Sequence, residues 1–310
     1  MILNNIKKLQ EAVDSRDLGY FENILKPTCR TLNTTQNFHA PLMLSAQNIK
    51  HLNKIDELQT DAIMLNLEDG VSEVMKPFAL RLSALVLSKL TTCSKKIVVR
   101  VNELNEGGVE EIEFLNSYMP DAIRVPKIRN VKDVEKALEL IDEKIEVHIS
   151  IETADAWLNL SKLAVSSRVK VFYLGVLDLF AELKLSQSLI TPTNPTIHYI
   201  LSHFLITSKA LHVKPVSFVF QDYKNIDEFQ KYIELEKSMG YDSKGCISPT
   251  QSQVMMSYFD SENIDEAKEI VELFEKSRAD GVTGFVSDKY GFIDEPIYKD
   301  ALNRISIANS

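Results

Sequence analysis

Two acidic residues, Glu152 and Asp178, lie at the ends of apolar runs of strand length, Val147–Thr153 and Val171–Asp178. A segment of helical length separates the runs, which predicts a strand–helix–strand unit with parallel, adjacent strands. Both acids should therefore emerge at the same edge of a sheet. Two converging carboxylates repel each other unless a cation lies between them or one is protonated. Oxygen ligands favour a hard ion, so the pair predicts a magnesium site. The alternative is that each acid caps the helix that follows it.

Further charged residues close other predicted strands. Arg100 stands in an apolar run, where its planar fork could bind a substrate carboxylate or form an internal ion pair with Glu68 or Asp69. Glu68 is expected to orient Arg100 or a metal-bound water, and Asp69 precedes a glycine as in many turns. Lys127 is expected to make an electrostatic contact or a structural ion pair. We assign Arg100 and Glu68 to catalysis, and Arg100, Asp69 and Lys127 to substrate binding.

Apolar runs alternate with segments of helical spacing, and this alternation predicts an α/β protein with a (β/α)8 TIM barrel. The eight predicted strands are Leu42–Ala46, Ala62–Leu67, Ile97–Asn102, Ala122–Ile128, Val147–Thr153, Val171–Asp178, Pro215–Gln221 and Gly245–Pro249. The rival, an open doubly wound sheet, normally needs a glycine-rich turn after its first strand, and Ser45-Ala46-Gln47 is not one. We expect residues 1–38 to form an N-terminal helical extension, 39–260 the barrel, and 261–310 C-terminal helices and a tail.

Composition narrows the class of protein. The 310 residues carry a net charge of −9 and show no basic stripe interleaved with aromatics, which argues against a nucleic-acid partner. The three cysteines are odd in number and far apart, as suits a reducing cytoplasm. No run approaches the length of a membrane span. We therefore expect a cytoplasmic enzyme with a small-molecule partner.

Seven short motifs, in shared order, resemble the citrate lyase beta subunit family of the HpcH/HpaI aldolase superfamily. They are Leu-Asn-Leu-Glu-Asp-Gly-Val at 65–71, Val-Arg-Val-Asn at 99–102, Val-Pro-Lys-Ile at 125–128, Ile-Glu-Thr-Ala at 151–154, Leu-Gly-Val-Leu-Asp-Leu at 174–179, Ile-Ser-Pro-Thr-Gln at 247–251 and Ile-Asp-Glu-Pro at 293–296. The resemblance implies a TIM barrel that holds magnesium on Glu152 and Asp178, with Arg100 on the carboxylate of a 2-oxo acid. It also implies citryl-, malyl- or citramalyl-coenzyme A substrates, and a trimer in which Asp294 enters the neighbouring subunit's site.

The chain departs from that family's pattern mainly at the part of the rim where relatives hold the thioester. The departures are His39-Ala40 for Arg-Ser, Ser45-Ala46 for Pro-Gly or Pro-Ala, Asn66 for Asp, Ser217 for Asp, and Ser248 for His. They weigh against a coenzyme A substrate more than against the metal. The first hypothesis is thus a magnesium-dependent carbon–carbon lyase or aldolase for a small hydroxy- or oxo-acid or its acyl-coenzyme A thioester. The alternatives are a catalytically impaired barrel that acts as a binding or complex-forming subunit, and a malate-synthase-like condensation at the same site.

Overall fold

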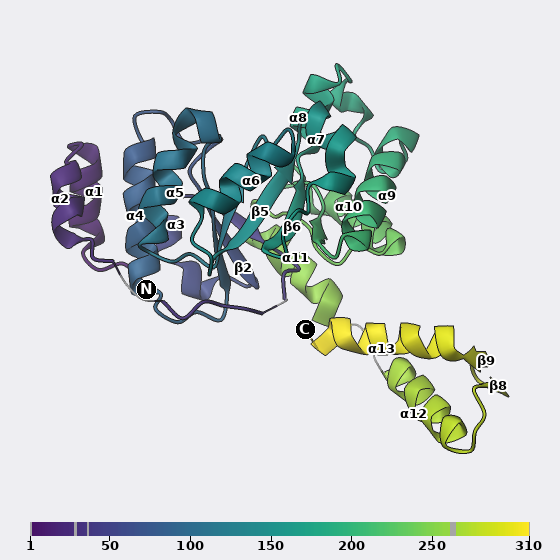
Figure 1. The fold of residues 1–310 in the computed structure, drawn as a ribbon. Helices are drawn as coiled ribbons and strands as arrows, with labels where there is room; N and C mark the ends of the chain where they lie inside the picture. The colour runs from purple at the N-terminus through teal and green to yellow at the C-terminus, as the bar shows by residue number, and fades with distance from the viewer. Residues whose placement is uncertain (1, 28–29, 36, 261–264, 310) are drawn as a thin grey trace. The chain divides into compact units, whose positions relative to one another are not determined.

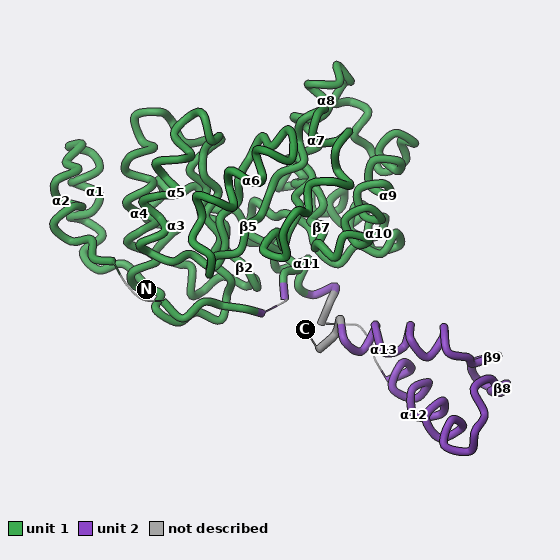
Figure 2. The backbone as a smooth tube through the Cα atoms, in the orientation of Figure 1, with its two compact units in different colours: residues 1–34, 38–256 green, residues 35–37, 257–310 purple. Residues whose placement is uncertain are grey.

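The computed structural model describes residues 2–27, 30–35, 37–260 and 265–309. The chain divides into two compact units, coloured separately in Figure 2. The first comprises residues 1–34 and 38–256, and the second comprises residues 35–37 and 257–310. Over the described residues, none of the helices combines the length and the apolar character needed to cross a bilayer.

The first unit is built on a curled sheet of seven strands, in which every neighbouring pair is parallel and the spatial order follows the chain (Figure 1). The strands are β1 (Leu42–Ser45), β2 (Ala62–Asn66), β3 (Lys96–Arg100), β4 (Ala122–Val125), β5 (Glu146–Ile151), β6 (Val169–Leu174) and β7 (Lys214–Val216). Their Val, Ile and Leu content is typical of strands that are buried on both faces. An apolar cluster packs together from several strands of the sheet, and its members include Met64, Val98, Val171 and Tyr173.

The predicted eighth strand, Gly245–Pro249, is not a strand in the structure. The sheet therefore has seven strands and not the eight that the sequence predicted. Cys246 of this segment and the preceding Lys244 instead form two isolated parallel bridges, Leu42↔Cys246 and Ser217↔Lys244. Met43 N donates to Cys246 O at 2.8 Å, which joins the segment to β1. The ladder stops there because Pro249 has no N–H to donate and begins a helix.

Helices follow most strands and cover the outside of the sheet (Figure 1). They are α3 (Ile49–Leu52), α4 (Lys76–Lys89), α5 (Val109–Asn116), α6 (Val131–Leu140), α7 (Ala154–Asn159), α8 (Val176–Glu182), α9 (Pro195–Ala210), α10 (Ile226–Met239) and α11 (Pro249–Asp260). Shorter helical turns are η1 (Ile55–Glu57), the π-type η2 (Leu104–Gly108), η3 (Leu160–Lys162) and η4 (Gln187–Leu189). Asparagine side chains begin several helices; Asn130, for example, forms a capping box at α6.

The N-terminal extension packs on the first unit through its two helices, α1 (Ile6–Asp14) and α2 (Leu18–Ile24), which contact α3 and α4. Leu9 and Val13 of α1 are buried, and Phe21 packs edge-on against Phe78 of α4. These contacts place the extension against the helices that follow β1 and β2.

The second unit contains α12 (Asp265–Ala279), an antiparallel hairpin of β8 (Gly284–Ser287) and β9 (Gly291–Asp294), and α13 (Glu295–Asn309). Its own small core consists of Ala267, Ile270, Phe274, Ile293 and Ala301. The helices expected within 261–310 are α12 and α13, and positions 261–264 and 310 of that range lie outside the described residues. The hairpin of β8 and β9 lies between the two helices.

Candidate active site

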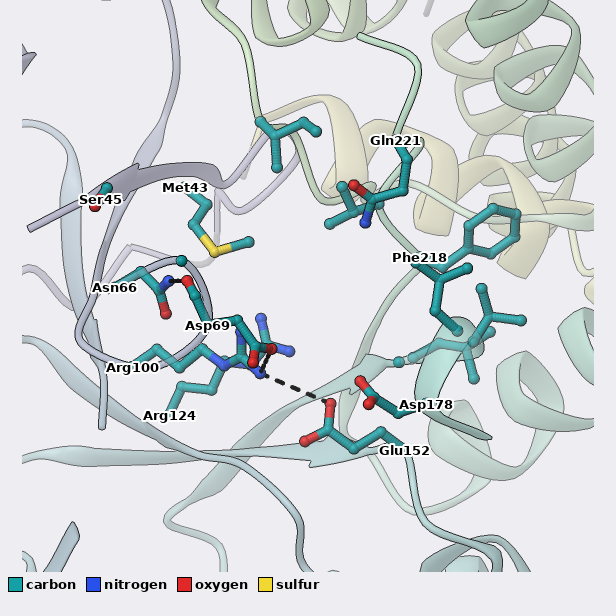
Figure 3. Close-up of a pocket in the computed structure, with 17 residues that line it drawn as sticks. Met43, Ser45, Asn66, Asp69, Arg100, Arg124, Glu152, Asp178, Phe218 and Gln221 are labelled. Atoms are coloured by element: carbon teal, nitrogen blue, oxygen red, sulfur yellow. Dashed lines mark hydrogen bonds and ion pairs between the residues drawn. The ribbon is translucent and has the colours of Figure 1, made fainter. Parts of the chain in front are cut away.

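A cavity of about 370 Å³ opens at the C-terminal ends of the parallel strands (Figure 3). Residues of β1, β2, β3, β4 and β6 line it, together with residues that follow β2, β5, β6 and β7 and with Ile247. Among the predicted site residues, Asp69, Arg100, Glu152 and Asp178 all line this cavity. Parallel strands deliver their carboxyl ends to one edge of the sheet, which is why residues far apart in sequence meet there.

Glu152 directly follows β5 and is only 2% exposed. Its Oε1 accepts a hydrogen bond from the backbone N of Lys127 at 2.8 Å. It does not cap the following helix, because Thr153 does so by accepting from Ala156 N at 3.1 Å. A Cβ at Gly175 would lie 2.6 Å from Glu152 Oε2, so this glycine leaves the space that the carboxylate occupies. Helix capping is therefore not the role of Glu152.

Asp178 does not end a strand, and the prediction of a strand over Val171–Asp178 was wrong at its end. β6 stops at Leu174, and Asp178 lies in the first turn of α8. The apolar residues Val176, Leu179 and Phe180 are buried at helical spacing, and a short apolar run of this kind does not distinguish strand from helix. The helix still begins at the sheet edge, so the Asp178 carboxylate lies beside Glu152 on the cavity wall (Figure 3).

Lys127 joins the two acids. Its backbone holds Glu152, and its Nζ lies 2.7 Å from Asp178 Oδ1. The residue has a φ of 52°, in the left-handed region, which a lysine adopts only where the surroundings enforce it. The ion pair predicted for Lys127 is therefore present, and its partner is Asp178, which the sequence predicted to be a metal ligand.

Arg100, the last residue of β3, is buried at the cavity wall and forms an ion pair with Glu68. Its Nη2 lies 3.3 Å from Asp69 Oδ2 and 4.0 Å from Glu152 Oε2. Of the two roles that the sequence left open for Arg100, the internal ion pair is therefore present, and carboxylate binding stays a prediction. Burial raises the pKa of Glu68 to about 7, against the attraction of the Arg100 guanidinium.

The carboxylate pair suits a hard divalent ion. Glu152 Oε2 accepts no hydrogen bond from the described residues and lies 4.0 Å from Arg100 Nη2, and Lys127 pairs with Asp178 through one oxygen, Oδ1. Within the described ranges, no group of three or more His, Cys, Asp or Glu side chains is arranged to hold an ion. Two carboxylates would leave most coordination positions to water and substrate oxygens, as is usual for magnesium.

Asp294, the remaining predicted catalytic residue, ends β9 in the second unit, where its Oδ1 accepts from Ile297 N at 3.3 Å. Of the divergent positions, Ser45 and Asn66 line the cavity, and Ser248 follows the lining residue Ile247. Asn66 donates to Asp69 O at 2.5 Å, which holds the turn after β2. Ser248 accepts from Gln251 N at 3.2 Å in the first turn of α11.

Sequence reasoning missed Arg124, which also lines the cavity. It lies in β4, and the register pairs it with Arg100 on the neighbouring strand. The signal was available, because Ala-Ile-Arg-Val places an arginine inside an apolar run just as Val-Val-Arg-Val does.

The structure is that of a parallel α/β protein with carboxylates and guanidinium groups around a cavity at the C-terminal edge of its sheet. Residues 40–249 match the HpcH/HpaI aldolase/citrate lyase family. The chain belongs to this family.

Among its relatives is the (3S)-malyl-CoA thioesterase of Cereibacter sphaeroides, 27% identical over 79% of this chain and 85% of that protein. The mitochondrial citramalyl-CoA lyase of Mus musculus is 24% identical over 100% of this chain and 98% of its own. The fold is similar to that of the CitE protein of Mycobacterium tuberculosis in complex with magnesium, acetoacetate and coenzyme A. That comparison has a TM-score of 0.69 at 20% identity and covers 88% of this chain and 98% of CitE.

Proposed function

We propose that this protein is a magnesium-dependent carbon–carbon lyase that acts on a small hydroxy- or oxo-carboxylic acid or its acyl-coenzyme A thioester. The observation that carries the proposal is the placement of Glu152 and Asp178 on one cavity wall, with the Arg100 guanidinium 4.0 Å from Glu152. Family membership supports it, since the relatives include a lyase and a thioesterase of acyl-coenzyme A compounds.

Each residue has a distinct role in this proposal. Glu152 and Asp178 hold the ion, which when bound would stabilise negative charge that develops on substrate oxygens. Arg100 binds the substrate carboxylate, and Glu68 orients Arg100 through their ion pair. Lys127 positions Glu152 through its backbone N–H and adds positive charge near the substrate.

The proposal also covers how the barrel closes and how copies of the chain assemble. We propose that segment 243–246, which bonds to β1 and to the residue after β7, takes the place of an eighth strand and closes the sheet into a barrel. We propose a cytoplasmic homotrimer in which Asp294 reaches the site of a neighbouring copy and Asp69 contacts substrate at the mouth of the cavity. The departures from the family pattern argue against coenzyme A, and two of them, Ser45 and Asn66, lie on the cavity wall.

The alternative of a catalytically impaired binding subunit is favoured by one observation: Lys127 Nζ already occupies one oxygen of Asp178. A stoichiometric protein partner, with no turnover of keto acids or acyl thioesters, would support that alternative. Condensation at the same site would use the same residues in the reverse direction, so only measured turnover in each direction separates it from cleavage.

Thermal unfolding with ligands tests the proposal. Magnesium with oxaloacetate, pyruvate or glyoxylate should raise the Tm, since a ligand at a hundredfold excess over its Kd stabilises by about 2.7 kcal/mol. Glu152→Ala and Asp178→Ala should each abolish this rise. Asp155→Ala is the matched control, because Asp155 is an exposed acid on α7 that pairs with Arg129 outside the cavity. An unchanged Tm in the wild type at millimolar ligand would refute the proposal.

A further inference from the structure

Arg124 is a second guanidinium on the wall of the cavity, and the roles proposed above do not use it. It lies in β4, where the strand register pairs it directly with Arg100 of β3. Only 6% of Arg124 is exposed, and that remainder faces the cavity. Figure 3 shows the two arginines next to each other on the same side of the cavity, opposite Phe218 and Gln221.

The contacts of Arg124 leave part of its guanidinium unused. Nε donates to Ser150 Oγ at 2.9 Å, and Nη1 lies 3.3 Å from the sulfur of Met64, a weak acceptor. The guanidinium carbon lies 4.0 Å from the centre of the Tyr173 ring, a cation–π contact that covers one face. Nη2 makes no hydrogen bond to any described residue, yet it is not among the enclosed atoms that lack a partner, so it is open to the cavity.

Arg124 lacks the direct ion pairs that Arg100 has, and Glu152 and Glu68 favour its charged form only from beyond ion-pairing distance. Arg100 forms ion pairs with Glu68 and Asp69. Across the part of the chain that the structure describes, no carboxylate lies within ion-pairing distance of Arg124. A buried charge is costly without a partner of opposite charge, so an anionic ligand bound beside Arg124 in the cavity would be stabilised.

The surrounding network holds the guanidinium in one orientation. The hydroxyl of Tyr173 lies 3.1 Å from His148 Nδ1, and His148 Nε2 lies 3.3 Å from Glu146, which pairs with Lys96 at 2.8 Å. Burial and the neighbouring Arg100 lower the pKa of Arg124 to about 10, so the group stays positively charged at neutral pH. An anion entering the cavity would meet a fixed, charged donor.

We propose that Arg124 is a specificity-determining residue that binds a second carboxylate of the ligand, so that the cavity selects short dicarboxylic acids over monocarboxylic acids. The inference rests on the proposed function in one respect, namely that Arg100 binds the first carboxylate. The register places the backbones of the two arginines about 5 Å apart on neighbouring strands, and both side chains line the same cavity, so one small diacid can contact both guanidinium groups.

The test compares malate with lactate, two 2-hydroxy acids that differ by one carboxylate, by isothermal titration calorimetry with and without magnesium. The wild type should bind malate at least about tenfold more tightly than lactate. Arg124→Gln should weaken malate binding about 10- to 100-fold, the usual effect of losing a charge-assisted hydrogen bond, and leave lactate within about twofold. Arg129→Gln, an arginine outside the cavity, is the matched control and should change neither affinity.

Equal wild-type affinity for malate and lactate would overturn the inference, as would an Arg124→Gln variant that weakens both acids equally. If Arg124→Gln does not fold, the inference is tested by the ratio of malate to lactate affinity in the wild type and in Arg124→Lys. Lysine keeps the charge, so Arg124→Lys should retain part of the preference for malate. Failure of the proposed function has a different appearance. If the malate preference requires Arg124 whether or not magnesium is present, and magnesium with the keto acids leaves the Tm of the wild type unchanged, the inference stands and the proposed lyase is refuted.

Discussion

Gly175→Ala is a single-methyl test of the way Glu152 is held. Gly175 lies between β6 and α8, and its φ of −93° is one that alanine adopts without strain. The added Cβ would nevertheless lie 2.4 Å from Glu152 Cβ and 2.6 Å from its Oε2. The first atom is close to the backbone of a residue that is 2% exposed, so a change of side-chain rotamer cannot relieve the clash. Either the turn after β6 or the end of β5 must move.

Overpacking of this kind costs about 1–3 kcal/mol, which corresponds to roughly 2–4 °C of Tm for each kcal/mol in a domain of this size. Displacement of Glu152 should also weaken magnesium binding by about 10- to 100-fold. Differential scanning calorimetry measures the first effect, and calorimetric titration with magnesium measures the second.

The matched control is Gly19→Ala in α2, where the nearest atom to the new Cβ is Asp17 Oδ1 at 3.3 Å and alanine favours the helix. Its Tm should stay the same or rise slightly, and its magnesium affinity should not change. A Gly175→Ala protein with wild-type Tm and magnesium affinity would refute the reasoning.

Two other substitutions test the electrostatics of the cavity. Burial raises the pKa of Glu68 from 4.5 to about 7. Between these pH values the folded protein keeps a proton on Glu68 that the unfolded chain releases. The free energy of unfolding therefore falls as the pH rises through this range, by about 3 kcal/mol. Glu68→Gln should flatten the pH dependence of urea unfolding in this window; Glu111, whose pKa burial also raises to about 7, should retain the rest. An unchanged slope would contradict this assignment. Lys127→Met removes a positive charge 2.7 Å from Asp178 and should raise magnesium affinity about three- to tenfold by calorimetric titration, whereas weaker binding would show that Lys127 supports the ion site.

Strand positions were largely predictable because buried strands leave a strong apolar pattern. β2, β3 and β5 lie within or nearly within the ranges that the sequence predicted. The errors occurred where apolar character continues past the end of the strand. After β6, the run that contains Asp178 is helical, and at Gly245–Pro249 the backbone pairs only through isolated bridges. Apolar character reports burial, and both strands and helices can be buried.

Arg124 shows a different limit. The same reasoning that singled out Arg100 applies to it, but nothing in the local sequence tells whether a buried arginine has a carboxylate partner. Register decides this: Arg100 sits near Glu68 because the turn after β2 brings that acid alongside β3. Arg124 meets Tyr173 and Ser150 instead, and its remaining donors face the cavity.

By itself, the sequence determined the class of this protein: short parallel strands alternating with helices, acids and an arginine at the strand ends, and motifs in the order of one enzyme family. Tertiary structure alone decided which charges compensate one another. Glu68 pairs with Arg100, Lys127 pairs with Asp178, and Arg124 pairs with no described carboxylate. The physical reason is that pairing depends on distances of a few ångströms between residues that are remote in the chain, and only strand register and loop conformation set those distances.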